Sequence, residues 1–255
     1  LMIRRPPRST LDRSSAAADV YKRQAPTWGF YDVSFQSTPF RFQRPYGSYV
    51  MENVLFKISY PAEFHAQTAV EAAVALHPEV SSRLHDIDKV VLTTHDSAIR
   101  IISKTGVLNN PADRDHCLQY MVAVGLLKGD LVAEDYEDGV AADSRLDRLR
   151  NSMVVEEDPR FSDEYHQPEK RSIANAVQVF FRDGTSTEKV TVEYPLGHRR
   201  RRGEGIPLLE DKFRRNLNTR FPVSRANQIE QLCMDQGALE ATPVNEFMDL
   251  LVVQD

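Results

Sequence analysis

The sequence predicts an α+β fold, in which an α/β layer is followed by a group of helices. Three observations carry this prediction. A strand, a helix and a second strand succeed one another between residues 54 and 93. A hairpin pattern follows in the segment 176–194, and three helical patterns then fill the chain from residue 206 onward. Strands and helices that alternate first and segregate later are typical of a two-part chain with one mixed sheet.

Composition sets the broad class. The chain has 255 residues, of which 41% are hydrophobic and 27% charged, and its net charge is -5. These values predict a globular protein that buries a real core, and they disfavour a nucleic-acid binder. No apolar run approaches the roughly 20 residues of a membrane span, so we expect no membrane partner. The only two cysteines, Cys117 and Cys233, lie far apart. A disulfide scaffold, a zinc ribbon and a three-cysteine iron–sulfur site are therefore unsupported, and we expect no metal site.

The first 45 residues are expected to contribute little regular structure. Residues 1–24 are rich in Arg, Ser, Pro and Ala, a composition typical of disorder. This stretch resembles translated library-adapter sequence, and because residue 1 is Leu we expect that the true N-terminus is missing. Residues 25–45 hold aromatic side chains between prolines and are expected to form a packed connector.

The first strand and helix meet at a histidine. Residues 54–60 alternate in the period-2 manner of a strand, which Pro61 should end. Residues 69–76 place apolar side chains at helical spacing, and this helix is expected to end before Pro78. His65 would then lie at the junction, where it could exchange protons while Lys57 holds a carboxylate. The alternative is a structural histidine at a helix start.

The middle of the chain alternates further. Residues 87–93 (IDKVVLT) predict a β-branched strand, and residues 97–103 a short helix. A helix is expected over 110–129, on which Tyr120 lies one turn from His116 and could donate to a substrate oxygen, although packing is the alternative. A charged helix over 140–153 should lead into a strand that ends at Asp158. His77, His85, His95 and His166 are interpreted as structural.

The hairpin and the arginines follow. Residues 176–181 and 186–194 alternate around an Asp-Gly turn. His198 and four arginines, Arg199–Arg202, come next. The arginines could contact nucleic acid, form a solvated loop paired with acidic neighbours, or recognise a polycarboxylate or phosphate through bidentate hydrogen bonds. For the third interpretation, Arg199 and Arg200 are the predicted substrate-binding residues.

Long blocks of this sequence resemble the MmgE/PrpD family, which contains 2-methylcitrate dehydratase and cis-aconitate decarboxylase. The blocks are YGSYVMENVLFKISYPAEFHAQTAVEAA, NNPADRDHCLQYMVAVG, KRSIANAVQVFFRDGTSTEKVTVEYPLGHRRRR and LEATPVNEFMDLLV. They resemble the C-terminal half of the family. The resemblance implies a lid domain over residues 46–202, and helices over 203–255 that belong to an incomplete all-helical domain.

The resemblance also implies an activity. Family members eliminate water from 2-methylcitrate without iron, in propionate breakdown, so a tricarboxylate substrate, a cytoplasmic homodimer and no cofactor are expected. Lys57, His65 and Tyr120 match the lysine, histidine and tyrosine of the family motif, while Gln67 could hold the histidine's place instead. Further catalytic groups would lie in the other half, so this chain alone is expected to be inactive. The alternative is a non-catalytic α/β module that binds polycarboxylates or a partner protein.

Overall fold

The computed structural model describes residues 35–38, 41 and 53–253 of the chain. Contacts divide the chain into two compact units, residues 1–51 and 52–255, and the fold below is that of the second unit. The predicted disordered segment 1–24 lies outside the described residues, as does most of the predicted connector 25–45. The predicted domain boundary at residue 203 falls inside the second unit and stays a prediction.

A mixed sheet of four strands, in the order β2-β1-β3-β4, forms the centre of the α/β part. Its strands are β1 (Ile87–Thr94), β2 (Met153–Glu157), β3 (Asn175–Phe181) and β4 (Val190–Val192). β1 pairs with β2 in parallel, with Val90 opposite Met153, and with β3 in antiparallel fashion. β3 and β4 form the expected hairpin, with the turn at Gly184 (φ 84°). The predicted strands 87–93 and 176–181 are confirmed.

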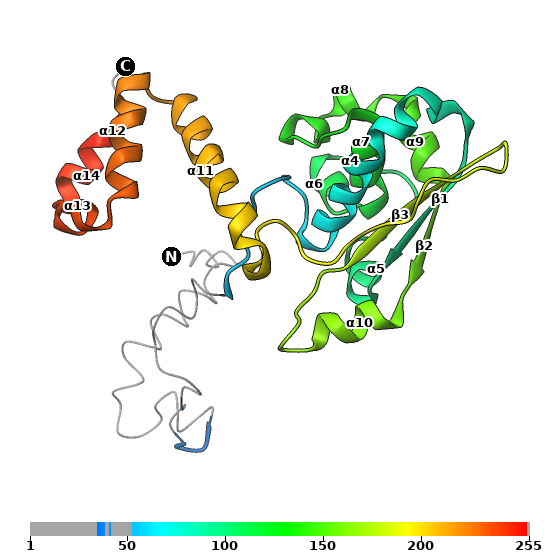
Figure 1. Ribbon diagram of the computed structural model, residues 1–255, viewed down its shortest axis with the longest axis horizontal. Coiled ribbons are helices and arrows are strands. Elements are labelled where there is room, and N and C mark those ends of the chain that lie inside the picture. The colour runs from blue at the N-terminus through cyan, green and yellow to red at the C-terminus, as the bar shows by residue number, and fades with distance from the viewer. Residues whose placement is uncertain (1–34, 39–40, 42–52, 254–255) are drawn as a thin grey trace, which may run out of the picture. The chain divides into compact units, whose positions relative to one another are not determined.

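Helices α4 (Gln67–Val80) and α7 (Leu118–Lys128) pack together beside this sheet (Figure 1). Their contact is close because small residues face one another: a Cβ on Gly125 would lie 3.0 Å from the Cβ of Ala73. α7 ends at Gly129, whose φ of 73° stops the helix as the sequence predicts. The main apolar core lies between these two helices and the inner strands. It holds Val70, Leu92 and Met121 out of contact with water.

Shorter elements complete the α/β part. They are η1 (Phe64–Ala66), η2 (Ser81–Asp86), α5 (Asp96–Ile102), α6 (Pro111–Asp115), η3 (Ala133–Tyr136), α8 (Asp138–Ala141), α9 (Ser144–Asn151) and α10 (Pro159–His166). Their starts follow helix-capping chemistry, since Asn110, Asp143 and Asp158 each accept a backbone N–H of the helix that follows. The expected short helix over 97–103 is confirmed as α5.

Helical segments occupy the described chain from residue 199 to its end, as expected. They are η4 (Arg199–Arg201), α11 (Arg202–Asn218), α12 (Val223–Met234), α13 (Gln236–Ala241) and α14 (Val244–Leu250). Leu217, Ala226 and Ile229 form a buried apolar cluster of their own, apart from the main core. With the mixed sheet, these helices confirm the α+β fold class. Across the described ranges, no helix is both long and apolar enough to span a bilayer.

Four predicted elements are wrong in detail. Residues 54–60 do not form a strand, because their backbone groups find partners outside a ladder: Phe56 N donates to Gly197 O, and Arg202 donates to Val54 O. α4 continues through Pro78, which stands in its last turn, where one missing N–H is tolerated.

The expected helix over 110–129 is two helices, α6 and α7, with an extended Cys117 (φ -122°, ψ 104°) between them. His116 and Tyr120 therefore do not share one helical face. The expected helix over 140–153 is likewise divided, because Asp143 caps a new helix start at Ser144.

Candidate functional site

His65 lies in the turn η1, where the chain from Pro61 enters α4. Glu63 precedes it as the N-cap, and its Oε2 accepts the backbone N–H of His65 at 2.8 Å. Both oxygens of the same carboxylate also lie against Nδ1 of the imidazole, at 2.8 and 2.9 Å. One carboxylate thus caps the turn and orients the histidine ring. The side chains of His65 and Glu63 are 13% and 17% exposed, so this pair is half-buried.

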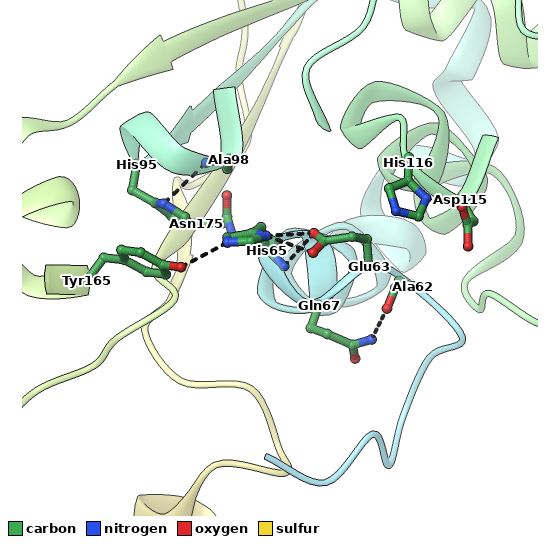
Figure 2. A network of polar contacts seen from close by, with 10 residues as sticks. All are labelled: Ala62, Glu63, His65, Gln67, His95, Ala98, Asp115, His116, Tyr165 and Asn175. Carbon is green, nitrogen blue, oxygen red and sulfur yellow. Dashed lines mark hydrogen bonds and ion pairs between the residues drawn. The ribbon is translucent and has the colours of Figure 1, made fainter. Parts of the chain in front are cut away.

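Tyr165 of α10 completes a chain of three polar groups. Its hydroxyl lies 3.1 Å from Nε2 of His65, as Figure 2 shows. When Nδ1 carries the proton and donates it to Glu63, Nε2 is free to accept the O–H of Tyr165. The order carboxylate, imidazole, phenol is one that can transfer a proton along its length.

His95 adds a second imidazole to this group. Its ring stacks on that of Tyr165, with centroids 4.6 Å apart and an interplanar angle of 11°, and lies 5.3 Å from the ring of His65. His95 is fully buried, and its Nδ1 accepts the N–H of Ala98 to cap α5. Within the described part of the chain its Nε2 has no hydrogen-bond partner. Burial, and then the nearby His65, lower the pKa of His95 to about 4, so it is neutral at pH 7. Glu63, His65, His95 and Tyr165 are called the His65 cluster below.

The backbone beneath the cluster is tied to the sheet. Asn175, at the start of β3, donates from Nδ2 to the carbonyl of His65 at 2.8 Å and to Oγ1 of Thr68 at 2.7 Å. Thr68 in turn donates to Ile173 O. A half-buried turn is thereby held rigidly, as the positioning of a reactive side chain requires.

Electrostatics within the pair are consistent with an ionised carboxylate. Burial raises the pKa of Glu63, but the hydrogen bond from His65 and the imidazole charge outweigh burial, so the net pKa is lowered. Glu63 is therefore an acceptor at neutral pH and can balance a proton on the imidazole.

The structure does not place Lys57 or Gln67 beside the His65 imidazole. Lys57 Nζ lies 5.0 Å from the ring centroid of Phe64, so that ring lies next to the lysine while His65 contacts Glu63 and Tyr165. Gln67 is buried, and its Nε2 donates to the carbonyl of Ala62 at 2.8 Å (Figure 2). The same Nε2 donates to the carbonyl of Tyr60, also at 2.8 Å. It therefore holds the loop that leads into η1.

Tyr120 lines a cavity to which the His65 cluster contributes no side chain. Its side chain is 2% exposed, and its hydroxyl donates to Asp135 O at 2.6 Å. Burial raises the pKa of Tyr120 to about 12. This cavity measures about 690 Å³ and is lined also by Arg114 and Arg150, whose charges are paired with Asp138 and Asp147.

Arg199 and Arg200 lie on the surface beside a loop. Arg200 donates to Glu169 O at 2.7 Å, and Arg199 donates to Asn53 Oδ1 at 3.2 Å. Arg201 is held more tightly, since it donates to Glu71, Glu204 and the carbonyl of Tyr194. Substrate binding by Arg199 and Arg200 stays a prediction.

Sequence reasoning missed Glu63, Tyr165 and His95. Glu63 carried a signal, because a carboxylate directly before a helical run is a potential N-cap. His95 also carried one, as it stands between the β1 pattern and a helix start. Tyr165 carried none, because it reaches His65 across 100 residues of sequence. Among the described residues, no group of three His, Cys, Asp or Glu side chains could hold a metal ion.

Comparison with known proteins agrees with the resemblance. Residues 60–236 match the model of the MmgE/PrpD C-terminal domain. The chain is 59% identical over 232 residues to the 2-methylcitrate dehydratase of Escherichia coli K12, covering 90% of the chain and 48% of that protein. It is 52% identical over 234 residues to the mitochondrial 2-methylcitrate dehydratase of Yarrowia lipolytica, covering 91% and 45%.

A 2-methylcitrate dehydratase-like protein of Aspergillus oryzae is 44% identical over 236 residues, covering 90% of the chain and 47% of that protein. The chain thus spans about half the length of the curated relatives it matches. The expected family is confirmed: this chain belongs to the MmgE/PrpD family, and residues 60–236 form its C-terminal domain.

Proposed function

We propose that this chain forms one wall of a 2-methylcitrate dehydratase active site, and that the His65 cluster is its proton-transfer group. The observation that carries the proposal is the chain from Glu63 through His65 to the hydroxyl of Tyr165, with donor–acceptor distances of 2.8 and 3.1 Å. The relatives named above support the substrate, since each of the first two is named a 2-methylcitrate dehydratase.

Elimination of water requires two proton transfers. One group removes a proton from the carbon beside a carboxylate, the electron pair of that C–H bond forms the C=C bond, and the hydroxyl leaves after protonation as water. We assign the second step to Tyr165, which would donate its proton to the departing hydroxyl while His65 is an imidazolium. Nε2 of the imidazolium would then return a proton to the phenolate oxygen of Tyr165, while Nδ1 keeps its hydrogen bond to Glu63. Solvent would restore the proton on His65 between turnovers. Glu63 would hold the imidazole in orientation and stabilise its charge. The group that removes the carbon-bound proton would come from the other half of the relatives' chain.

The other predicted residues have supporting roles in the proposal. Arg199 and Arg200 would bind substrate carboxylates through the fork geometry of arginine, and Lys57, predicted to be catalytic, would hold a carboxylate as a point charge. Tyr120 could contact substrate only if its hydroxyl left Asp135 O, and Gln67 only if it released the loop carbonyls. A lid over residues 46–202, a homodimer and a cytoplasmic location are also proposed, although the Yarrowia lipolytica relative is named mitochondrial.

The test uses a fusion protein. In a relative, the part that precedes the segment matched by this chain is joined to this chain, and a single residue of this chain is then substituted. His65→Gln should lower kcat on 2-methylcitrate by ~100-fold or more, measured by the ultraviolet absorbance of the conjugated product. His85→Gln is the matched control, because that side chain is 72% exposed on η2 and should leave kcat unchanged. Full turnover by the His65→Gln protein would disprove the assignment. Binding without turnover in the unsubstituted protein would favour the non-catalytic module instead.

A further inference from the structure

Helix α11 presents two faces with different charge environments. On one face Arg214 is paired twice, through Nη1 with Asp211 at 2.6 Å and through Nη2 with Glu230 at 2.6 Å. On another face Leu208, Lys212, Arg215 and Thr219 recur at three- and four-residue spacing, so they are neighbours along one side of the helix. This second side lines a cavity of about 570 Å³. Its opposite wall is formed by residues 58–61 and 130–133.

The helix is held close to this wall. A Cβ on Gly205 would lie 2.5 Å from Leu196 O and 3.0 Å from Cδ1 of Ile58, so only glycine permits the approach. Further along the helix, Lys212 Nζ donates to the carbonyl of Lys57 at 2.5 Å. The cavity, of about 570 Å³, is of the size that small ligands occupy in proteins.

The charges around the cavity do not cancel. No ion pair among the described residues includes Lys57, Lys212 or Arg215. Among the lining residues of the described chain, Asp130 is the sole carboxylate, and its Oδ1 accepts the N–H of Leu131 at 2.8 Å. Burial, and then the charges of Lys57 and Arg215, lower the pKa of Lys212. Three cations therefore lie within electrostatic reach of one another, with a surplus of positive charge that an anion would neutralise.

We propose that this cavity binds a small multivalent anion, a polycarboxylate or a phosphate, through Lys212 and Arg215. Hydroxyl groups of Ser59, Tyr60 and Thr219 also lie in its walls and suit an anion as hydrogen-bond donors. The site is separate from the His65 cluster, none of whose side chains lines the cavity. It does not depend on the proposed dehydratase chemistry, because it requires binding alone.

Isothermal titration of the full chain with tricarballylate, with inorganic phosphate and with acetate, at constant ionic strength, tests the proposal. We expect saturable binding of one equivalent of tricarballylate or phosphate, and much weaker binding of acetate, which carries a single charge. Whichever of the first two binds more tightly identifies the ligand class. Absence of saturable binding by both would overturn the proposal.

Variants separate a defined site from general charge attraction. Lys212→Gln and Arg215→Gln should each weaken binding by about tenfold, the loss expected when one charged hydrogen-bond donor is removed. Arg214→Gln removes the same charge from the same helix on its paired face, and should leave the affinity unchanged. An equal loss in the Arg214→Gln protein would overturn the site.

Two further measurements make the result decisive. Circular dichroism confirms that each variant is folded, and amide chemical-shift changes on adding the anion should map to 58–61, 130–133 and 208–219. Shifts confined elsewhere would contradict the proposal. His65→Gln should bind the anion as the unsubstituted chain does. Loss of anion binding in the His65→Gln protein would show that the anion binds at the His65 cluster instead. If only the dehydratase assignment is wrong, the affinity of the chain for the anion should be unchanged.

Discussion

The His65 cluster and the arginine run, Arg199–Arg202, differ in how their polar groups are used. Both stand where an extended segment enters a helix, and each lies at a buried histidine that caps a helical turn: His95 of the cluster caps α5, and His198, directly before the run, caps η4. In the cluster, side chains from three segments contact one another, and an imidazole stands between a carboxylate and a phenol. In the run, the guanidinium groups donate to backbone carbonyls and to Glu71 and Glu204, and so connect loops.

Charge density along the sequence therefore does not indicate where polar side chains from distant segments meet. Four consecutive arginines are conspicuous, yet each of them donates to an oxygen of the chain itself. A single histidine is inconspicuous, but the fold places a carboxylate on one side of its ring and a phenol on the other. The side chains that the fold places beside a polar group determine how that group is used.

Substitutions in the two regions should change different kinetic constants, and this is where we expect the largest change. In a protein that joins this chain to the other half of the relatives, Tyr165→Phe should lower kcat by ~100-fold, because the donor to the leaving hydroxyl is lost. Arg200→Gln should instead raise KM with little change in kcat, as expected for a residue that binds substrate and transition state equally. Steady-state kinetics on 2-methylcitrate measure both. A fall in kcat for Arg200→Gln alone would reverse the roles assigned to the two regions.

The second effect is a loss of stability in acid, to which each region contributes one histidine. Burial lowers the pKa of His95 and of His198 to about 4, with His65 adding to the first shift and neighbouring arginines to the second. The unfolded chain binds more protons between pH 6.5 and 4, so stability falls as the pH drops through this window. Each histidine accounts for about 3 kcal/mol over the window.

Urea unfolding between pH 7 and 4 measures this loss. His95→Asn and His198→Asn retain a side chain that can cap the helix, and each should flatten the pH dependence. The exposed His85→Asn is the control and should leave the slope unchanged. An unchanged slope in both buried variants would show that these histidines titrate normally.

A smaller effect distinguishes members of the arginine run. Arg201→Met removes the donor to Glu71, Glu204 and Tyr194 O, and the hydrogen bond with Glu71 is the main reason that its pKa is raised. We expect a loss of about 1 to 3 kcal/mol, since a 23% exposed Glu71 is left without this partner. Arg199→Met, at the surface, should cost less than ~0.5 kcal/mol. If both variants lose the same free energy of unfolding in chemical denaturation, Arg199 and Arg201 contribute equally to stability.

The smallest effect tests the coupling inside the cluster. His65→Phe removes the side-chain hydrogen bond and the imidazole charge that lower the pKa of Glu63, so that pKa should rise. The backbone N–H of residue 65 still donates to the carboxylate in this variant. Carboxyl carbon NMR follows the titration directly. Asp143, whose pKa is lowered by Arg145, is a control that should not change. A constant Glu63 pKa would mean that the carboxylate and the imidazole are not coupled.

Much of the fold follows from local patterns. The β-branched run of β1, the Asp-Gly hairpin of β3 and β4, the Asn110 and Asp158 caps and the stop at Gly129 are all determined within a few residues. The strand expected over 54–60 was wrong for a physical reason. Alternation specifies two faces but not a ladder partner, and here the backbone bonds to Gly197 and Arg202 instead.

The sequence by itself determined the family, the fold class and the histidine at the entrance to α4, because these depend on contiguous residues and local capping. Only the tertiary structure decided what that histidine touches. Tyr165 and His95 arrive from α10 and from the end of β1, Asn175 fixes the turn from β3, and Lys57 and Tyr120 lie against other neighbours. Hydrogen bonds of this kind depend on distances between remote segments, which are set by how the helices pack on the sheet rather than by spacing along the chain.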